Sequence, residues 1–155
     1  MVLKPMDYHF LIENIPYTQK AIGTDKGLAK IGDGIVNLAY SVAKSIYLTK
    51  KDTTDNITRT GDKVSKKVLA KALKDANMKD FAKNRANSHD MANTVEAIIA
   101  YLWLNDKISI HKLIYLLITN LSGNITHRIK EVDNAAYAFT QVLLSVKQNL
   151  PEKEL

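Results

Sequence analysis

The 155-residue chain is predicted to fold as an all-α domain, and three features of its sequence indicate this class. Its three prolines stand at positions 5, 16 and 151, so residues 17–150 lack the strongest helix breaker. Apolar residues recur in that region at three- and four-residue steps, which is the period of an amphipathic helix. No segment shows the alternation of apolar and polar residues, bounded by turn pairs, that is typical of β-hairpins.

The first half of the chain predicts three helices. A short helix is expected over residues 8–14, and one long amphipathic helix over residues 24–49. The apolar stripe of the long helix consists of Leu28, Ile31, Ile35, Leu38, Val42 and Ile46. After a polar loop at residues 50–61, a second apolar stripe predicts a helix over residues 64–73.

Capping residues mark the helices of the second half. Ser88 is expected to cap a helix that reaches residue 104, because its hydroxyl can accept a hydrogen bond from a free backbone N–H of the first turn. Ser109 opens a helix over residues 110–121 in the same way, and a last helix is expected over residues 131–149.

Composition limits the class of protein. With 46% hydrophobic and 25% charged residues the chain is globular, and its length fits one domain, expected over residues 1–150 with a polar tail at residues 151–155. The sequence holds no cysteine, which excludes disulfides, Cys-based zinc sites and thiol nucleophiles. No apolar run reaches the roughly 20 residues that span a bilayer, so we expect a cytoplasmic protein without a membrane partner.

A single carboxylate stands within a strongly apolar segment. Residues 95–104 read VEAIIAYLWL, and Glu96 is the only charged residue among them. A carboxylate left unpaired in a core costs several kcal/mol, so Glu96 must be paired, exposed or bound to a cation. Asn93, one helical turn earlier, is placed to bind the same hard cation through its side-chain oxygen. The alternative is that Glu96 marks the polar edge of an amphipathic helix.

Two glycines flank an aspartate in the middle of the long helix. Gly32 and Gly34 each cost about 1 kcal/mol relative to alanine inside a helix, so they indicate a close backbone approach or room for a ligand. Asp33 between them projects opposite the apolar stripe. The residues that share its side of the helix are Asn37, Tyr40 and Lys44. That side is either part of a site or a solvated face with an Asp33–Asn37 contact.

Positive charge is concentrated in one segment. The formal net charge is +6, and residues 62–85 hold eight basic and three acidic residues. Lys63, Lys67, Lys71 and Lys74 share one face of the predicted helix, a row suited to following the phosphates of a nucleic acid. The scarcity of arginine argues against recognition of base edges. A solvated lysine face is the alternative.

Several enzyme classes lack support in the sequence. The four histidines show no HExxH spacing, and there is neither a phosphate-binding glycine loop nor a GxSxG nucleophile motif. We therefore expect no small-molecule cofactor.

Three segments, in order, resemble the ribonuclease III family. LAKIGDGIVNLAYSVA (residues 28–43) resembles the signature helix of that family, with a hydrophobic-Gly-Asp core at its centre. NTVEAIIAYLWL (residues 93–104) resembles its second motif, where an acidic residue three places before a glutamate opens an apolar helix. GDKVSKKVLAKAL (residues 61–73) resembles the helix that precedes this motif.

The resemblance implies an all-α endonuclease that dimerises, lays double-stranded RNA along a valley and cuts it with Mg²⁺ (or Mn²⁺) held by carboxylates. Asp33 falls on the aspartate of the Gly-Asp core and Glu96 on the metal-binding glutamate of the second motif. The implied catalytic residues are Asp33 and Glu96, and the implied metal ligands are these two with Asn93. Cleavage in this family leaves 5′-phosphate and 3′-hydroxyl ends.

The chain departs from the family pattern at three positions. The full signature carries acids where this sequence has Lys26 and Ala29, and an aspartate where it has Asn93. The minimal family members, which lack a double-stranded-RNA-binding domain, tolerate a reduced signature, and the chain is similar to them.

Three hypotheses follow. The first is a homodimeric, metal-dependent endoribonuclease that acts on double-stranded or structured RNA in RNA processing. The second is a catalytically degenerate RNA-binding or ribonucleoprotein scaffold with the same fold. The third is a helical interaction domain without a role in RNA.

Overall fold

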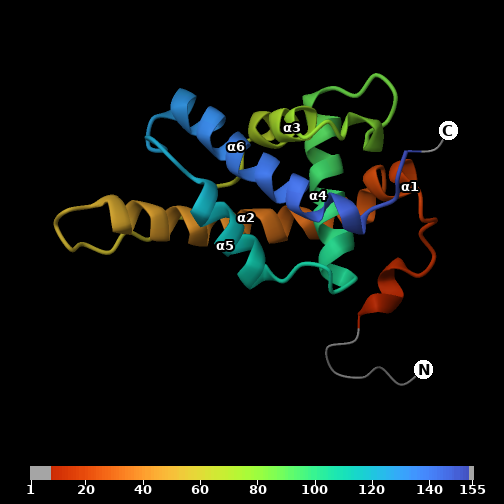
Figure 1. Cartoon of the computed structure of the whole chain (residues 1–155), viewed down its shortest axis with the longest axis horizontal. Coiled ribbons are helices and arrows are strands. Elements are labelled where there is room, and N and C mark those ends of the chain that lie inside the picture. The colour runs from red at the N-terminus through yellow and green to blue at the C-terminus, as the bar shows by residue number, and fades with distance from the viewer. Residues whose placement is uncertain (1–7, 154–155) are drawn as a thin grey trace.

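The computed structural model describes residues 8–153, and all regular structure in that range is helical, which confirms the predicted all-α class (Figure 1). The α-helices are α1 (Gln19–Gly23), α2 (Lys26–Lys51), α3 (Lys66–Asp75), α4 (Ser88–Leu104), α5 (Ile110–Asn120) and α6 (Arg128–Val146). Short 3₁₀ helices lie at His9–Ile12, Lys79–Phe81 and Lys147–Asn149. No helix in the described range is both long and apolar enough to cross a membrane.

Helix α4 is the centre of the fold, and α2 crosses it steeply (Figure 1). It also packs against α1 and α3. Almost every side chain between Met91 and Leu104 is buried, as expected for a helix that is apolar on all sides. Glu96 is only 7% exposed. The alternative that Glu96 stands on an exposed polar edge is therefore wrong.

Helix α2 buries a different face from the predicted apolar stripe. Leu28 and Ile35 are buried as expected, but Ile31 is 38% and Leu38 52% exposed. The buried face carries mostly small side chains, which let α2 approach α4 closely. Its members are Ala29, Gly32, Val36, Ala39, Tyr40, Ala43 and Lys44. Hydrophobicity alone does not distinguish this face, because close packing selects for size as well.

The segment after α2 returns along the helix and is bound to it at regular intervals. Asn37, Ser45 and Thr49 each accept a hydrogen bond from a backbone N–H of this segment, at 2.7, 2.9 and 2.9 Å. The donors are Val64, Thr60 and Thr58 respectively. Each step of four residues along α2 corresponds to a step of two residues along the segment. The two steps match because four helical residues and two extended residues span nearly the same length, about 6–7 Å. The pairing fixes the segment that leads into α3.

The predicted helix boundaries agree with the structure to within a few residues. Helix α5 is capped by Ser109, whose side chain accepts a hydrogen bond from Lys112 N, as predicted. Helix α4 is capped by Asn87 rather than Ser88, since Asn87 and Asp90 form a reciprocal capping box. The five-residue helix α1 was not predicted, and α3 begins at Lys66, two residues later than expected.

The two chain ends are only partly described. Residues 1–7 of the predicted domain and residues 154–155 of the predicted tail lie outside the described residues. Pro151 is buried, and its carbonyl oxygen accepts a hydrogen bond from Gln19 Nε2 at 3.1 Å.

Candidate active site

The α2–α4 crossing brings the two motif carboxylates together. Gly32 lies directly against the backbone of Glu96, because a Cβ added at Gly32 would stand 1.8 Å from the Glu96 carbonyl oxygen. Only glycine permits this approach. Gly34, in contrast, has no atom from another described part of the chain within 4 Å of an added Cβ. The close approach inferred from the glycines therefore belongs to Gly32, and it places the neighbouring Asp33 beside Glu96.

The carboxyl group of Asp33 lies within hydrogen-bonding reach of that of Glu96, and both line the same pocket. Burial foremost, and then the hydrogen bond to Asp33 and its negative charge, raise the pKa of Glu96 to about 8. Lys63 and Lys66 act in the opposite direction. With a pKa of about 8, the Glu96 carboxyl group keeps its proton near neutral pH.

Asn37 positions Asp33 relative to the segment after α2. Its Nδ2 donates to Asp33 Oδ1 at 3.0 Å, and its Oδ1 accepts the hydrogen bond from Val64 N at 2.7 Å. The Asp33–Asn37 contact expected for a solvated face is present, but it lies inside a site. Through Asn37, the Asp33 carboxylate is tied to the residues that enter α3.

The carboxyl pair faces a pocket of about 490 Å³ between α2, α3 and α4, which we call the carboxylate pocket. Its polar lining is dominated by cations. The acidic and amide residues are Asp33, Glu96 and Asn93, and the basic ones are Lys26, Lys30, Lys63, Lys66 and His89. Four lysines around two carboxyl groups that retain a proton make the pocket electropositive, which favours a phosphate. Lys26 and Ala29, which replace two acids of the family signature, both line it.

The predicted lysine row is divided in the structure. Lys63 precedes α3 and lines the carboxylate pocket, whereas Lys67 lies on the first turn of the helix. Lys71 is paired with Asp75 at 3.0 Å, and Lys74 is exposed. The four lysines therefore do not form one helical row, because the helix begins after Lys63.

Two groups of contacts near the site were not predicted from the sequence. Lys66 contacts Nδ1 of His89 at the mouth of the carboxylate pocket. The buried Lys44 binds Asp62 at 2.9 Å and Glu131 at 2.6 Å. The sequence indicated only that Lys44 lies on the same side of α2 as Tyr40. It did not indicate the ion pair with Glu131, because that residue is far from Lys44 in the sequence.

The donor set suits a hard cation. Two converging carboxyl groups and the amide of Asn93 offer the oxygen ligands that Mg²⁺ prefers, and a cation would take the place of the proton on Glu96. Within residues 8–153 no cluster of three or more His, Cys, Asp or Glu side chains is arranged to hold a metal. Two carboxylates and one amide are a ligand number that Mg²⁺ accepts, because it keeps several waters in many protein sites.

The fold and the site define an all-α domain in which two helices present a carboxyl pair to a lysine-lined pocket. A family model described as Ribonuclease III matches residues 26–152, which is most of the chain. The chain therefore belongs to the ribonuclease III family, as the sequence motifs implied. A comparison with curated proteins gave no match.

Proposed function

We propose that the protein is a metal-dependent endoribonuclease that hydrolyses phosphodiester bonds of double-stranded or structured RNA in RNA processing. Membership of the ribonuclease III family supports a ribonuclease role. The observation that carries the proposal is the convergence of Asp33 and Glu96, from two helices, in a pocket whose other charged residues are cations. Two acidic side chains surrounded by cations suit a site where the acids would hold a divalent metal ion and the cations would hold the phosphodiester.

The residues of the pocket have distinct roles in this proposal. Asp33 and Glu96 hold Mg²⁺ or Mn²⁺, and the amide oxygen of Asn93 is the third ligand. The bound metal supplies Lewis-acid chemistry at the scissile phosphate. Lys63 and Lys66 bind phosphate oxygens, and Asn37 holds Asp33 in position. Lys67, Lys71 and Lys74 extend the contact to the RNA backbone along α3.

The proposed active form is a homodimer that joins through α2. Ile31 and Leu38 expose apolar surface on one side of this helix, and Val42 continues the same stripe. Exposed apolar rows of this kind are covered in the functional state of many proteins. A single domain of this size needs a second copy to hold both strands of a duplex.

Cleavage of RNA tests the proposal. The pure protein is incubated with a long RNA duplex and Mg²⁺ or Mn²⁺, with excess EDTA as the control. We expect fragments with 5′-phosphate and 3′-hydroxyl ends that form only with metal. No cleavage, or cleavage that survives the combined change D33N and E96Q, overturns the proposal.

Three residues that line the carboxylate pocket favour one alternative function. Lys26, Ala29 and Asn93 stand where the family signature has acids, so the site has less negative charge to hold metal. A catalytically degenerate RNA-binding or ribonucleoprotein scaffold has the same pocket without the reaction. Salt-sensitive RNA binding that needs no metal, together with absence of cleavage, supports this alternative.

A further inference from the structure

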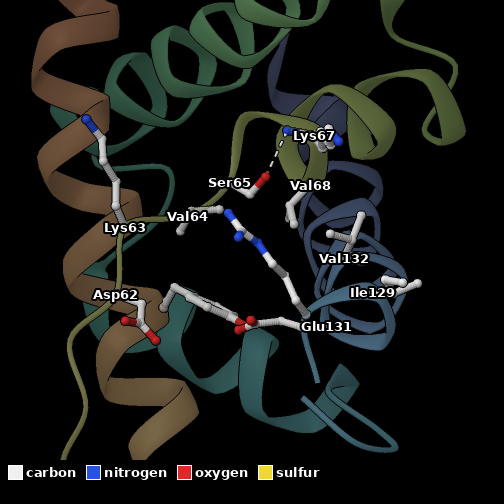
Figure 2. A pocket seen from close by; sticks show the side chains of 11 residues that line it. Asp62, Lys63, Val64, Ser65, Lys67, Val68, Ile129, Glu131 and Val132 are labelled. Atoms are coloured by element: carbon white, nitrogen blue, oxygen red, sulfur yellow. Dashed lines mark hydrogen bonds between the residues drawn. The ribbon is translucent and has the colours of Figure 1, made fainter. Parts of the chain in front are cut away.

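A second pocket lies beside the carboxylate pocket, between the segment that enters α3 and the start of α6 (Figure 2). Its volume is about 540 Å³, within the roughly 300–1,000 Å³ of pockets that hold small ligands. We call it the α3–α6 pocket. Its charged lining residues are Asp62, Lys63, Lys67, Arg128 and Glu131. None of the roles proposed above uses Arg128.

The acidic groups of this pocket are already neutralised in part. Lys44, only 6% exposed, binds Asp62 at 2.9 Å and Glu131 at 2.6 Å. Tyr40 also donates to Glu131, at 2.6 Å. Burial disfavours the charge on Lys44, but the hydrogen bonds to Glu131 and Asp62 outweigh it and raise the pKa of Lys44 above its usual value. Lys44 thus remains charged, and the carboxylates below the pocket are held in fixed positions.

The basic groups, in contrast, have no acidic partner within the described part of the chain. Lys63, Lys67 and Arg128 form no ion pair among residues 8–153. Asp62 and Glu131 carry two negative charges, and Lys44 balances one of them. The three positive charges therefore exceed the one negative charge that remains. The α3–α6 pocket therefore attracts an anion.

The positions of these cations oppose the stability of their own helices. Arg128 is the first residue of α6, and Lys66 and Lys67 begin α3, whose first turn has no acidic residue. A positive charge at a helix N-terminus is unfavourable by about 0.3–1 kcal/mol, because it faces the positive end of the helix dipole. A local arrangement that costs stability is expected where function requires it.

The remaining wall of the pocket is apolar. Val132 of α6 and Val68 of α3 face it, with Val68 between Val132 and Ser65, and Ile129 stands at its outer edge (Figure 2). Ile129 is 73% exposed, so it is not there to complete a core. Cations beside an exposed apolar wall suit a nucleotide, whose phosphate is charged and whose ribose and base have apolar faces.

The two pockets are adjacent. Lys63 and Val64 line both of them. In Figure 2 the side chain of Lys63 extends along α2, away from the centre of the α3–α6 pocket. Its charge also reaches Glu96, whose pKa it lowers against the larger effect of burial. Neighbouring nucleotides of one RNA strand that crosses Lys63 would thus lie over the two pockets.

We propose that the α3–α6 pocket binds one nucleotide of the RNA strand, adjacent to the nucleotide at Asp33 and Glu96. Arg128 and Lys67 bind its phosphate, and Ile129 and Val132 contact its ribose or base. The planar guanidinium of Arg128 suits two phosphate oxygens at once. The proposal rests on the proposed RNA substrate, but it does not depend on cleavage.

Binding without metal tests the pocket separately from catalysis. The affinity for a uniform RNA duplex is measured in EDTA by fluorescence anisotropy at several salt concentrations. We expect R128A to weaken binding about tenfold at low salt and to reduce the salt dependence by about one counterion. The matched control is K107A, which removes one exposed positive charge outside both pockets. Its effect is expected to stay below about twofold.

Two further variants sharpen the result. R128K keeps the charge but not the planar fork, so we expect an affinity between those of the wild type and R128A. K67A is expected to weaken binding as R128A does. Circular dichroism checks that each variant keeps its helical content, which is expected because both side chains are exposed.

The proposal is overturned if R128A binds the duplex as tightly as K107A does. Titration with AMP and inorganic phosphate distinguishes a free ligand from RNA. If AMP binds the wild type and not R128A while both bind RNA equally, the pocket serves a free nucleotide and the proposal is wrong. Failure of cleavage in Mg²⁺ with the expected loss of binding in R128A contradicts the proposed reaction and leaves the binding pocket supported.

Discussion

At the scale of single residues, Glu96 decides how the site is understood. It is a buried carboxyl group in the central helix, and the carboxyl group of Asp33 lies beside it. Such a pair has a large cost when both groups are ionised and no cation is present. A cation bound between the two groups would remove this cost. The buried pair therefore supports a metal role over a purely structural one.

The pH dependence of stability tests this view of Glu96. Its pKa in the folded state, about 8, lies above the usual 4.5, so the fold favours the protonated form. The contribution of protonated Glu96 to the free energy of unfolding is therefore complete below pH 4.5, and it is lost as the pH rises through 8. Without metal, we expect E96Q to be more stable than the wild type at pH 8 by about 1–2 kcal/mol, because glutamine resembles the protonated form.

Denaturant titrations at pH 5 and pH 8 in EDTA measure this difference. The advantage of E96Q should shrink at pH 5, and Mg²⁺ should stabilise the wild type but not the variant. A wild-type protein that is as stable as E96Q at both pH values contradicts the raised pKa of Glu96.

Part of the site followed from sequence and part did not. Asp33 and Glu96 were identified because each breaks a local pattern, a glycine-flanked acid in a helix and a charge in an apolar run. Lys44, Asp62 and Glu131 break no local pattern, and their ion pairs join residues 18 and 87 positions apart. Pairing between such distant residues depends on how α2 and α6 pack, which periodicity does not contain.

At the scale of elements, α2 organises the molecule. One side packs closely against α4, another binds the segment that leads into α3, and a third exposes Ile31 and Leu38. The extent and period of α2 were predictable, but its buried face was not. The polar residues at multiples of four, Asn37, Ser45 and Thr49, were a signal for the bound segment, because a solvated face needs no such spacing.

Substitution of the two glycines separates their roles. We expect G32A to lower stability by about 3 kcal/mol or more and to disturb the carboxyl pair, because the added methyl group collides with the backbone of Glu96. G34A is the matched control, since its methyl group would meet no other element within residues 8–153. Thermal unfolding followed by circular dichroism measures both. Equal melting temperatures for G32A and G34A contradict the close α2–α4 contact.

At the scale of the whole molecule, one all-α domain presents a basic surface on one side of α2 and an apolar stripe on another. The net charge of +6 alone permitted a nucleic-acid partner without locating it. The structure gathers Lys26, Lys30, Lys63 and Lys66 around the carboxyl pair. These residues come from two separate segments, so the sequence pattern around residues 62–85 revealed only half of this surface.

The oligomeric state tests the apolar stripe. We expect the wild type to sediment as a dimer at micromolar concentration and L38E to sediment as a monomer, because a charge in an apolar interface is left unpaired. L144E is the matched control, since Leu144 of α6 is 43% exposed but lies outside the stripe. If L38E and L144E have the same sedimentation coefficient, the interface does not lie on α2.

The central claim is that Asp33 and Glu96 act together as one metal site for RNA cleavage. Single-turnover cleavage of an RNA duplex in Mg²⁺, measured for the wild type, D33N, E96Q and the double variant, tests it most directly. We expect each single change to reduce the rate by about 100-fold or more, and the double change to reduce it little further, because either change disables the same site. Losses that multiply in the double variant, or cleavage that persists in it, contradict a shared metal site.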